Sequence, residues 1–109
     1  REKIGKLANI YCDQVILTAE DNRDEDIQEI CLDIQEYIEK PVSVIITDRR
    51  IAIEQAIEIA NKGDIILILG KGHEQFMASS IGNEPYPGDK YVALRAIDKI
   101  FKGEDENEL

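Results

Sequence analysis

The sequence has 109 residues, about the size of one domain, and 43% of them are hydrophobic, which argues against a disordered chain. Its formal net charge of −10, from 23 acidic and 13 basic residues, predicts a surface that repels nucleic acid and anionic membranes, so we expect neither as a partner. Neither a signal peptide nor an apolar run long enough to span a bilayer is present, and we therefore expect a cytoplasmic protein.

The first part of the chain alternates between helical and strand patterns. Residues 2–11 place Ile4, Leu7, Ala8 and Tyr11 at helical spacing. The continuous apolar run at 15–18 predicts a strand covered on both faces, and a charged loop follows it. Acidic residues then precede an amphipathic stripe from Ile27 to Ile38, which predicts a second helix.

The second part repeats this alternation. A β-branched run at 42–46 predicts a strand, and Asp48 is a candidate N-cap for a third helix, which we expect Gly63 to close. Five apolar residues at 65–69 predict a central, fully buried strand.

The last part contains a loop and a final helix. A weak signal suggests a hairpin of residues 76–78 against a return near Tyr86, within a loop rich in glycine and proline. The last helix is expected over residues 89–101, where Asp89 is interpreted as a helix-capping residue.

Alternating helices and strands of this length imply right-handed crossovers between parallel strands. We predict an α/β fold, a three-layer Rossmann-like domain with a mostly parallel sheet, over residues 1–103, followed by a disordered acidic tail at 104–109. Cys12 and Cys31 lie within apolar patterns and form no Cys-x-x-Cys pair, so we expect two buried free thiols and no metal site.

Two chemically rich segments follow predicted strands, at the sheet edge where ligands bind in such folds. One is the run Gly70-Lys71-Gly72-His73-Glu74. Its glycines let the backbone approach a ligand closely. Lys71 could bind a phosphate or carboxylate, and Glu74 could bind an ammonium group. His73 could orient Glu74 or contact the ligand. It matches neither the P-loop nor the dinucleotide-binding pattern, and the alternative is a tight turn with exposed charges.

The other segment is Glu20-Asp21-Asn22-Arg23. Carboxylates beside an arginine can hold a zwitterionic ligand by its ammonium and carboxylate groups. A solvated turn whose acids cap the following helix is the alternative, and charged loops of that kind are common.

The strand followed by Gly-Lys-Gly-His-Glu resembles the C-terminal domain of the Mur ligases, and within them the UDP-N-acetylmuramoyl-tripeptide synthetases. The resemblance covers nearly the whole chain. The segment from Thr18 to Arg23 is similar to the family's Thr-x-Asp-Asn-Pro-Arg, and Asp48-Arg49 with Ala52-Ile53 is similar to its Asp-Arg-x-x-Ala-Ile helix start. Asp89 before the last helix also fits. On this resemblance, the chain is a fragment that lacks the domain's first strand.

The resemblance implies a part of an ATP-dependent ligase of peptidoglycan precursor synthesis. ATP and Mg²⁺ would be bound mainly by a central domain, and the nucleotide part of UDP-MurNAc-L-Ala-D-Glu by an N-terminal domain, both outside these residues. ATP would convert the D-glutamate carboxylate to an acyl phosphate, which the amine of the incoming amino acid attacks. By analogy, Gly70 and Glu74 would hold the distal end of that amino acid beside Arg23. The chain alone is expected to be inactive and to hold no cofactor or catalytic residue.

One departure from the family pattern concerns the first loop, where Glu20-Asp21-Asn22 replaces Asp-Asn-Pro. Arg23 favours meso-diaminopimelate, whose distal carboxylate an arginine binds in the family. The carboxylates of Glu20, Asp21 and Glu74 would instead suit a lone ammonium, as on L-lysine or ornithine. The added residue is therefore expected to be a diamino acid of either type. A related polyglutamate- or cyanophycin-type ligase and a stand-alone ligand-binding module are the alternatives.

Overall fold

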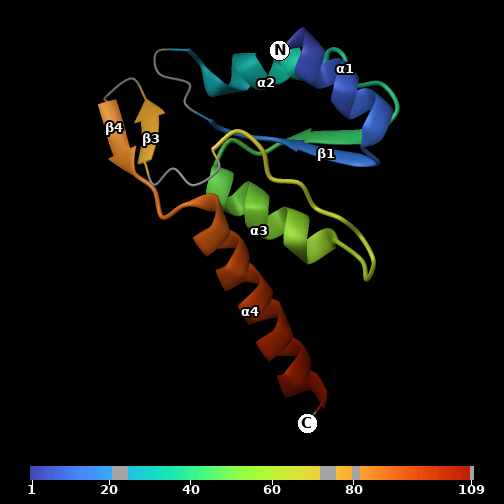
Figure 1. Ribbon diagram of the computed structural model, residues 1–109, viewed down its shortest axis with the longest axis vertical. Coiled ribbons are helices and arrows are strands. Elements are labelled where there is room, and N and C mark those ends of the chain that lie inside the picture. The colour runs from blue at the N-terminus through green and yellow to red at the C-terminus, as the bar shows by residue number, and fades with distance from the viewer. Residues whose placement is uncertain (21–24, 72–75, 80–81, 109) are drawn as a thin grey trace.

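The computed structural model describes residues 1–20, 25–71, 76–79 and 82–108, and it shows an α/β chain with helices on both sides of a small parallel sheet. The elements, in chain order, are α1 (Glu2–Tyr11), β1 (Gln14–Leu17), α2 (Ile27–Gln35), β2 (Val42–Ile45), α3 (Arg49–Ile59), β3 (Phe76–Ser79), β4 (Gly82–Pro85) and α4 (Asp89–Glu108). α1 and α2 lie on one side of β1 and β2, and α3 lies on the other (Figure 1).

The sheet pairing follows the predicted crossovers. β1 pairs with β2 in parallel, with Gln14 opposite Val42 and Leu17 opposite Ile45, and α2 forms the connection between them. β3 and β4 form a separate antiparallel hairpin that precedes α4, as the weak hairpin signal suggested. The hairpin therefore lies between the second loop of interest and the last helix.

Two helices begin at side-chain caps: Asp48, which the sequence predicted as a cap, and Asp26, which it placed only in an acidic helix start. The Asp26 side chain accepts a hydrogen bond of 2.8 Å from the backbone N–H of Gln28 at the start of α2. The Asp48 side chain accepts bonds of 3.0 and 3.3 Å from the N–H groups of Arg50 and Ile51 at the start of α3. All three bonds satisfy backbone donors that have no partner inside the helix.

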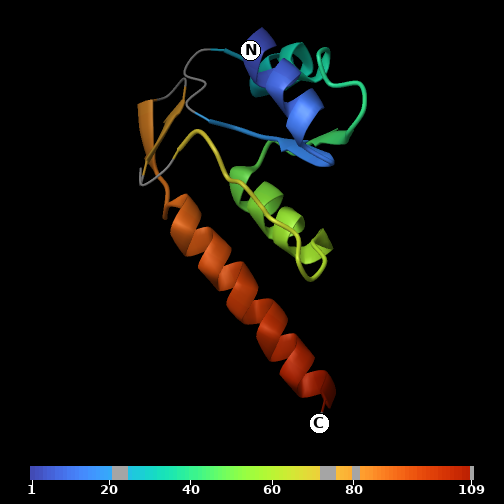
Figure 2. The same ribbon diagram turned by 45° about the vertical axis from the view of Figure 1, so that its right-hand side comes forward.

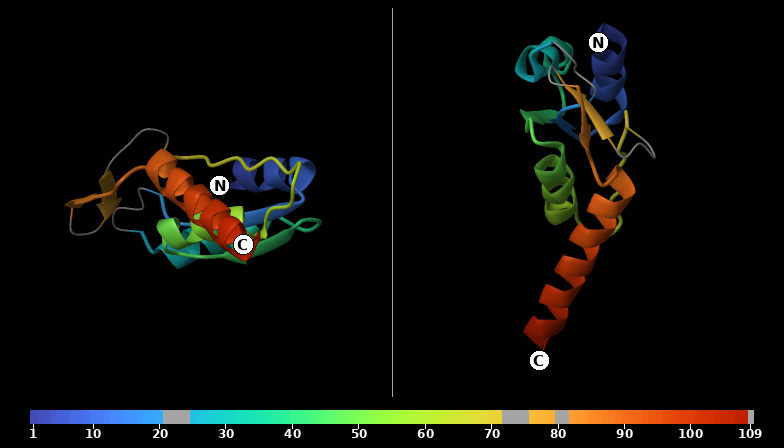
Figure 3. Two further views of the ribbon diagram at one scale, coloured as in Figure 1. Left: turned by 90° about the horizontal axis from the view of Figure 1, so that it is seen from below. Right: turned by 90° about the vertical axis from the view of Figure 1, so that its left-hand side faces the viewer.

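Two hydrophobic clusters lie on opposite sides of the sheet, as the right-hand view of Figure 3 shows for the helices that form them. Beneath α1 and α2, the buried residues are Leu17, Cys31 and Ile38. Between α3 and α4, they are Ile53, Tyr86 and Val92, against which Ile68 also packs. The sheet of β1 and β2 therefore separates two small cores.

The predicted central strand at 65–69 was wrong. These residues are extended without strand pairing to any described residue, and only Ile68 among them is half-buried, while Ile65 is 87% and Leu67 73% exposed. An apolar run indicates a buried strand only where neighbouring strands flank it, and the sheet described here consists of β1 and β2 alone. The side chains at 65–69 are nevertheless more and less exposed in turn, with the two-residue period of an extended chain.

The face on which α1 packs also differs from the prediction. Ile4, Leu7 and Tyr11 are exposed, and Gly5 is the buried residue of the helix. A Cβ on Gly5 would lie 2.6 Å from the backbone oxygen of Ile34, so the absence of a side chain allows α1 to cross α2 closely. The small size of Gly5, and not the apolar spacing of the helix, determines the contact between α1 and α2.

Three further expectations are corrected by the structure. Cys31 is buried, but Cys12 is exposed, because it lies just past the end of α1; neither forms a disulfide. α3 ends before Ala60 in extended backbone, so Gly63, with φ of +94°, belongs to a later turn and does not occupy the C′ position. α4 continues to Glu108, past residue 101 where the last helix was expected to end, and its C-terminal part extends beyond the rest of the chain (Figure 2).

Candidate functional site

The two loops of interest begin side by side. Glu20 follows β1, and Gly70 follows the extended segment 65–69. Gly70 has φ of +108°, and a Cβ on it would lie 2.8 Å from Cδ of Glu20 and about as close to both carboxylate oxygens, at 3.0 and 3.1 Å. The structure therefore brings a carboxylate of the first loop against the glycine that opens the second.

Lys71, the next residue, is 2% exposed. The alternative in which this turn displays exposed charges does not hold for Lys71, whose side chain is directed away from solvent. Its positive charge contributes to the low pKa of Asp89, so the ammonium group lies within electrostatic range of that carboxylate. A role of Lys71 in binding a ligand stays a prediction.

Four of the predicted site residues lie outside the described residues, and the structure says nothing of their positions. These are Asp21 and Arg23 in the first loop and His73 and Glu74 in the second.

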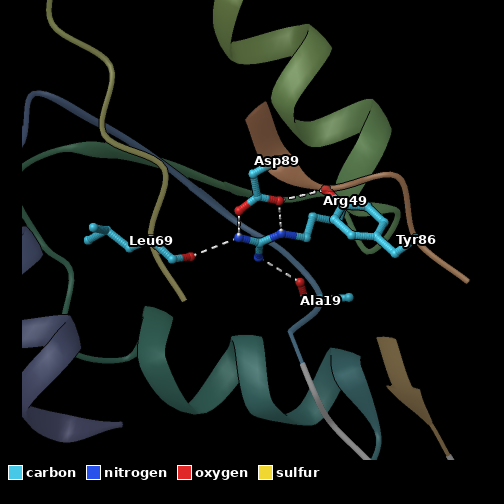
Figure 4. Close-up of polar contacts among 5 residues, drawn as sticks. All are labelled: Ala19, Arg49, Leu69, Tyr86 and Asp89. Carbon is cyan, nitrogen blue, oxygen red and sulfur yellow. Dashed lines mark hydrogen bonds and ion pairs between the residues drawn. The ribbon is translucent and has the colours of Figure 1, made fainter. Parts of the chain in front are cut away.

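The first residue of α3 connects both loops to the start of α4 (Figure 4). The Arg49 guanidinium donates two hydrogen bonds to Asp89, from Nε to Oδ1 at 2.8 Å and from Nη2 to Oδ2 at 2.7 Å. It also donates from Nη1 to the backbone oxygen of Ala19 and from Nη2 to that of Leu69, each at 2.9 Å. Tyr86 completes the cluster by donating its hydroxyl hydrogen to Oδ1 of Asp89 at 2.6 Å.

This cluster is shielded from water. The side chains of Arg49 and Asp89 are 4% and 7% exposed. A buried ion pair persists when its remaining donors and acceptors are also satisfied, and the two carbonyl groups and the Tyr86 hydroxyl supply those bonds here.

The charges of the cluster reinforce one another. Burial alone would raise the pKa of Asp89, but hydrogen bonds from Arg49 and Tyr86 outweigh it and hold that pKa below its ordinary value. Burial would likewise lower the pKa of Arg49, and Asp89 reverses that effect. Burial, and then the hydrogen bond to Asp89, raises the pKa of Tyr86 to about 12. At neutral pH the cluster therefore contains a carboxylate, a guanidinium and a neutral phenol.

The sequence interpretation missed this cluster because it treated Asp89 as a helix cap. The structure shows that both carboxylate oxygens of Asp89, at the first position of α4, bind side chains from elsewhere in the chain. A usable signal was present. Arg49 lies three and four positions before Ala52 and Ile53, on the apolar stripe of α3, and Asp89 lies likewise before Val92 on that of α4. Opposite charges on two buried stripes predict an ion pair.

Two features are absent from the described part of the chain. No helix there is both long enough and apolar enough to cross a membrane. No group of three or more His, Cys, Asp or Glu side chains there is placed to hold a metal ion.

Comparison with known proteins places the chain in a family. The family model described as "Mur ligase, glutamate ligase domain" matches residues 1–72. This chain belongs to the Mur ligases and forms their C-terminal domain. The Mur ligase domain is 47% identical over 98 residues to a UDP-N-acetylmuramoyl-L-alanyl-D-glutamate--2,6-diaminopimelate ligase of Aquifex aeolicus. The aligned residues cover 89% of this chain and 20% of that relative.

Other relatives have similar names and similar coverage. A UDP-N-acetylmuramyl-tripeptide synthetase of Borreliella burgdorferi is 37% identical over 106 residues, covering 94% of this chain and 21% of the relative. A 2,6-diaminopimelate ligase of Bacillus velezensis is 39% identical over 103 residues, with the same two shares of 94% and 21%. The domain thus spans about a fifth of the length of the curated relatives it matches.

Proposed function

We propose that this Mur ligase domain binds the incoming amino acid in an ATP-dependent ligase that adds a diamino acid to UDP-MurNAc-L-Ala-D-Glu. The observation that carries the proposal is the closeness of Glu20 to Gly70, the first residues of the two loops that we propose to bind the ligand. The relatives are named as 2,6-diaminopimelate ligases or as a tripeptide synthetase, and these names support the same reaction.

The proposed site combines described and undescribed residues. Gly70 and Glu74 would hold the distal end of the amino acid, with Arg23 and Asp21 beside it, and Glu20 would contribute a carboxylate next to Gly70. An arginine beside carboxylates suits a ligand that carries both an ammonium and a carboxylate at one end, which is the chemistry of meso-diaminopimelate. L-lysine would use the carboxylates alone. His73 and Lys71 would support the loop or contact the ligand.

ATP and Mg²⁺ would be held outside these residues. The sequence contains no Gly-x-x-x-x-Gly-Lys-Ser/Thr segment, in which backbone N–H groups cradle phosphates, and the central domain of the longer enzyme would supply one. When bound there, ATP supplies the energy for activating the D-glutamate carboxylate. This domain's own residues would bind the amino acid and orient its amine toward the activated carboxylate.

The domain would also have a fuller architecture in the longer protein. We propose that residues 1–103 belong to a three-layer, mostly parallel α/β domain. Helices on both sides of the parallel strands β1 and β2 support this proposal.

The test is ADP formation by the full-length enzyme supplied with ATP, Mg²⁺, UDP-MurNAc-L-Ala-D-Glu and one amino acid at a time. We expect turnover with a diamino acid, meso-diaminopimelate or L-lysine, and little with L-glutamate. Omission of the dipeptide substrate serves as the control and should abolish turnover. Turnover that prefers L-glutamate, or that requires no UDP-linked substrate, would favour a polyglutamate-type ligase and contradict the proposal.

A further inference from the structure

The hydrogen bonds of the Arg49 side chain reach the residues that directly precede both segments of the proposed site. Its guanidinium binds the backbone oxygens of Ala19 and Leu69, each at 2.9 Å. Ala19 directly precedes Glu20, and Leu69 directly precedes Gly70. The two carbonyl groups thus belong to the last residue before each ligand-binding segment, and a single rigid group holds them together.

The geometry of an arginine makes this connection stiff. A guanidinium is planar, and its N–H donors point in fixed directions, so four bonds made by one such group fix the relative positions of their acceptors. Asp89 receives two of these bonds and thereby fixes the rotation of the guanidinium, and Tyr86 in turn binds Asp89. The cluster as a whole is anchored on the starts of α3 and α4, which are regular elements.

We propose that Arg49 is a positioning residue for amino-acid binding: it holds the two loops at the separation that the ligand requires, while touching no ligand itself. This inference rests on the proposed function. Asp89 and Tyr86 act through Arg49 by keeping its guanidinium oriented. A side chain with the same charge but without the planar fork cannot bind Asp89 in a bidentate manner and both carbonyl groups at once.

The test is Arg49→Lys in the full-length enzyme, with separate measurements of KM for the amino acid, ATP and the UDP-linked dipeptide. We expect KM for the amino acid to rise at least tenfold, with the other two constants changed by less than twofold. Arg50→Lys is the matched control, since Arg50 is the next residue of α3 and is exposed. It should leave all three constants unchanged.

A merely structural role predicts a different pattern. Loss of folded enzyme would lower the melting temperature and the kcat calculated per total protein. It would leave each of the three KM values equal to that of the unsubstituted enzyme. That pattern, or an unchanged amino-acid KM in folded Arg49→Lys enzyme, would overturn the inference.

Tyr86→Phe provides a second variant in case Arg49→Lys does not fold, because it removes one hydrogen bond and keeps the aromatic ring of the core. We expect it to raise the amino-acid KM about threefold, again without change for ATP, and an unchanged value would count against the inference. Absence of amino-acid-dependent ADP formation in the unsubstituted enzyme would overturn the proposed function itself, before any variant is compared.

Discussion

Substitution of Gly70 by alanine tests whether the contact between the two loops matters for binding. A Cβ at this position would lie 2.8 Å from Cδ of Glu20, closer than Cβ atoms approach other heavy atoms in proteins. Glu20 is exposed, so its side chain can rotate away at little cost. The substitution should therefore move the Glu20 carboxylate out of the site.

The backbone contributes a separate effect. Gly70 has φ of +108°, which a residue with a side chain adopts only at a cost of about 1–3 kcal/mol. Gly63 offers a matched control, because its φ is +94° and a Cβ there would meet nothing within 4 Å. Gly63→Ala and Gly70→Ala should thus lower the free energy of unfolding by similar amounts, about 1–3 kcal/mol each.

The two variants should differ in ligand binding. A charge-assisted hydrogen bond contributes about 1.5–3 kcal/mol, and 1.4 kcal/mol corresponds to a factor of ten in affinity. We therefore expect Gly70→Ala to raise the amino-acid KM of the full-length enzyme at least about tenfold. Gly63→Ala should leave it unchanged. Equal KM values for the two variants would refute the idea that the contact between Glu20 and Gly70 shapes the binding site.

Three further predictions follow from the described contacts. Gly5→Ala should lower the free energy of unfolding by about 1–3 kcal/mol, because its Cβ would lie 2.6 Å from a backbone oxygen of α2; an unchanged denaturant midpoint would contradict this. Cys12 should react with a thiol reagent far faster than Cys31, whose burial also raises its pKa, and equal rates would show that Cys31 is accessible. The pKa of Tyr86 is raised from 10.0 to about 12, so the contribution of its hydroxyl to the free energy of unfolding is present below pH 10 and is lost as pH rises toward 12. The difference in the free energy of unfolding between the unsubstituted protein and Tyr86→Phe should therefore shrink by up to about 2–3 kcal/mol over that range.

Local signals predicted the helices well where capping and apolar spacing agree. α2 and α3 begin after Asp26 and Asp48, whose side chains accept backbone N–H bonds. Such capping depends only on residues within one turn, so the sequence carries it in full. Tertiary contacts decide the exceptions: α1 buries Gly5 and exposes Tyr11, because closeness to α2 outweighs the apolar stripe.

Strand pairing was harder to predict because it depends on partners far away in the sequence. The runs at 14–17 and 42–45 pair with each other, but the more apolar run at 65–69 pairs with no described strand. Hydrophobicity indicates that a segment tends to be buried, and it does not specify the neighbouring strand that would bury it.

The candidate site was predictable in part. Charged segments after predicted strands indicated the two places that meet at Glu20 and Gly70. The role of Arg49 was not predicted, since its partner Asp89 lies 40 residues later in the sequence and the pairing requires the packing of α3 against α4. A charge on an apolar helix stripe is the local sign of such a pair.

Glu74→Gln in the full-length enzyme tests most directly whether this domain selects the amino acid. Glu58→Gln, an exposed carboxylate on α3, is the matched control. We expect Glu74→Gln to raise the KM for the amino acid at least about tenfold and to leave the KM for ATP unchanged, because it removes the carboxylate that we propose to bind an ammonium group. An amino-acid KM equal to that of Glu58→Gln would contradict the account.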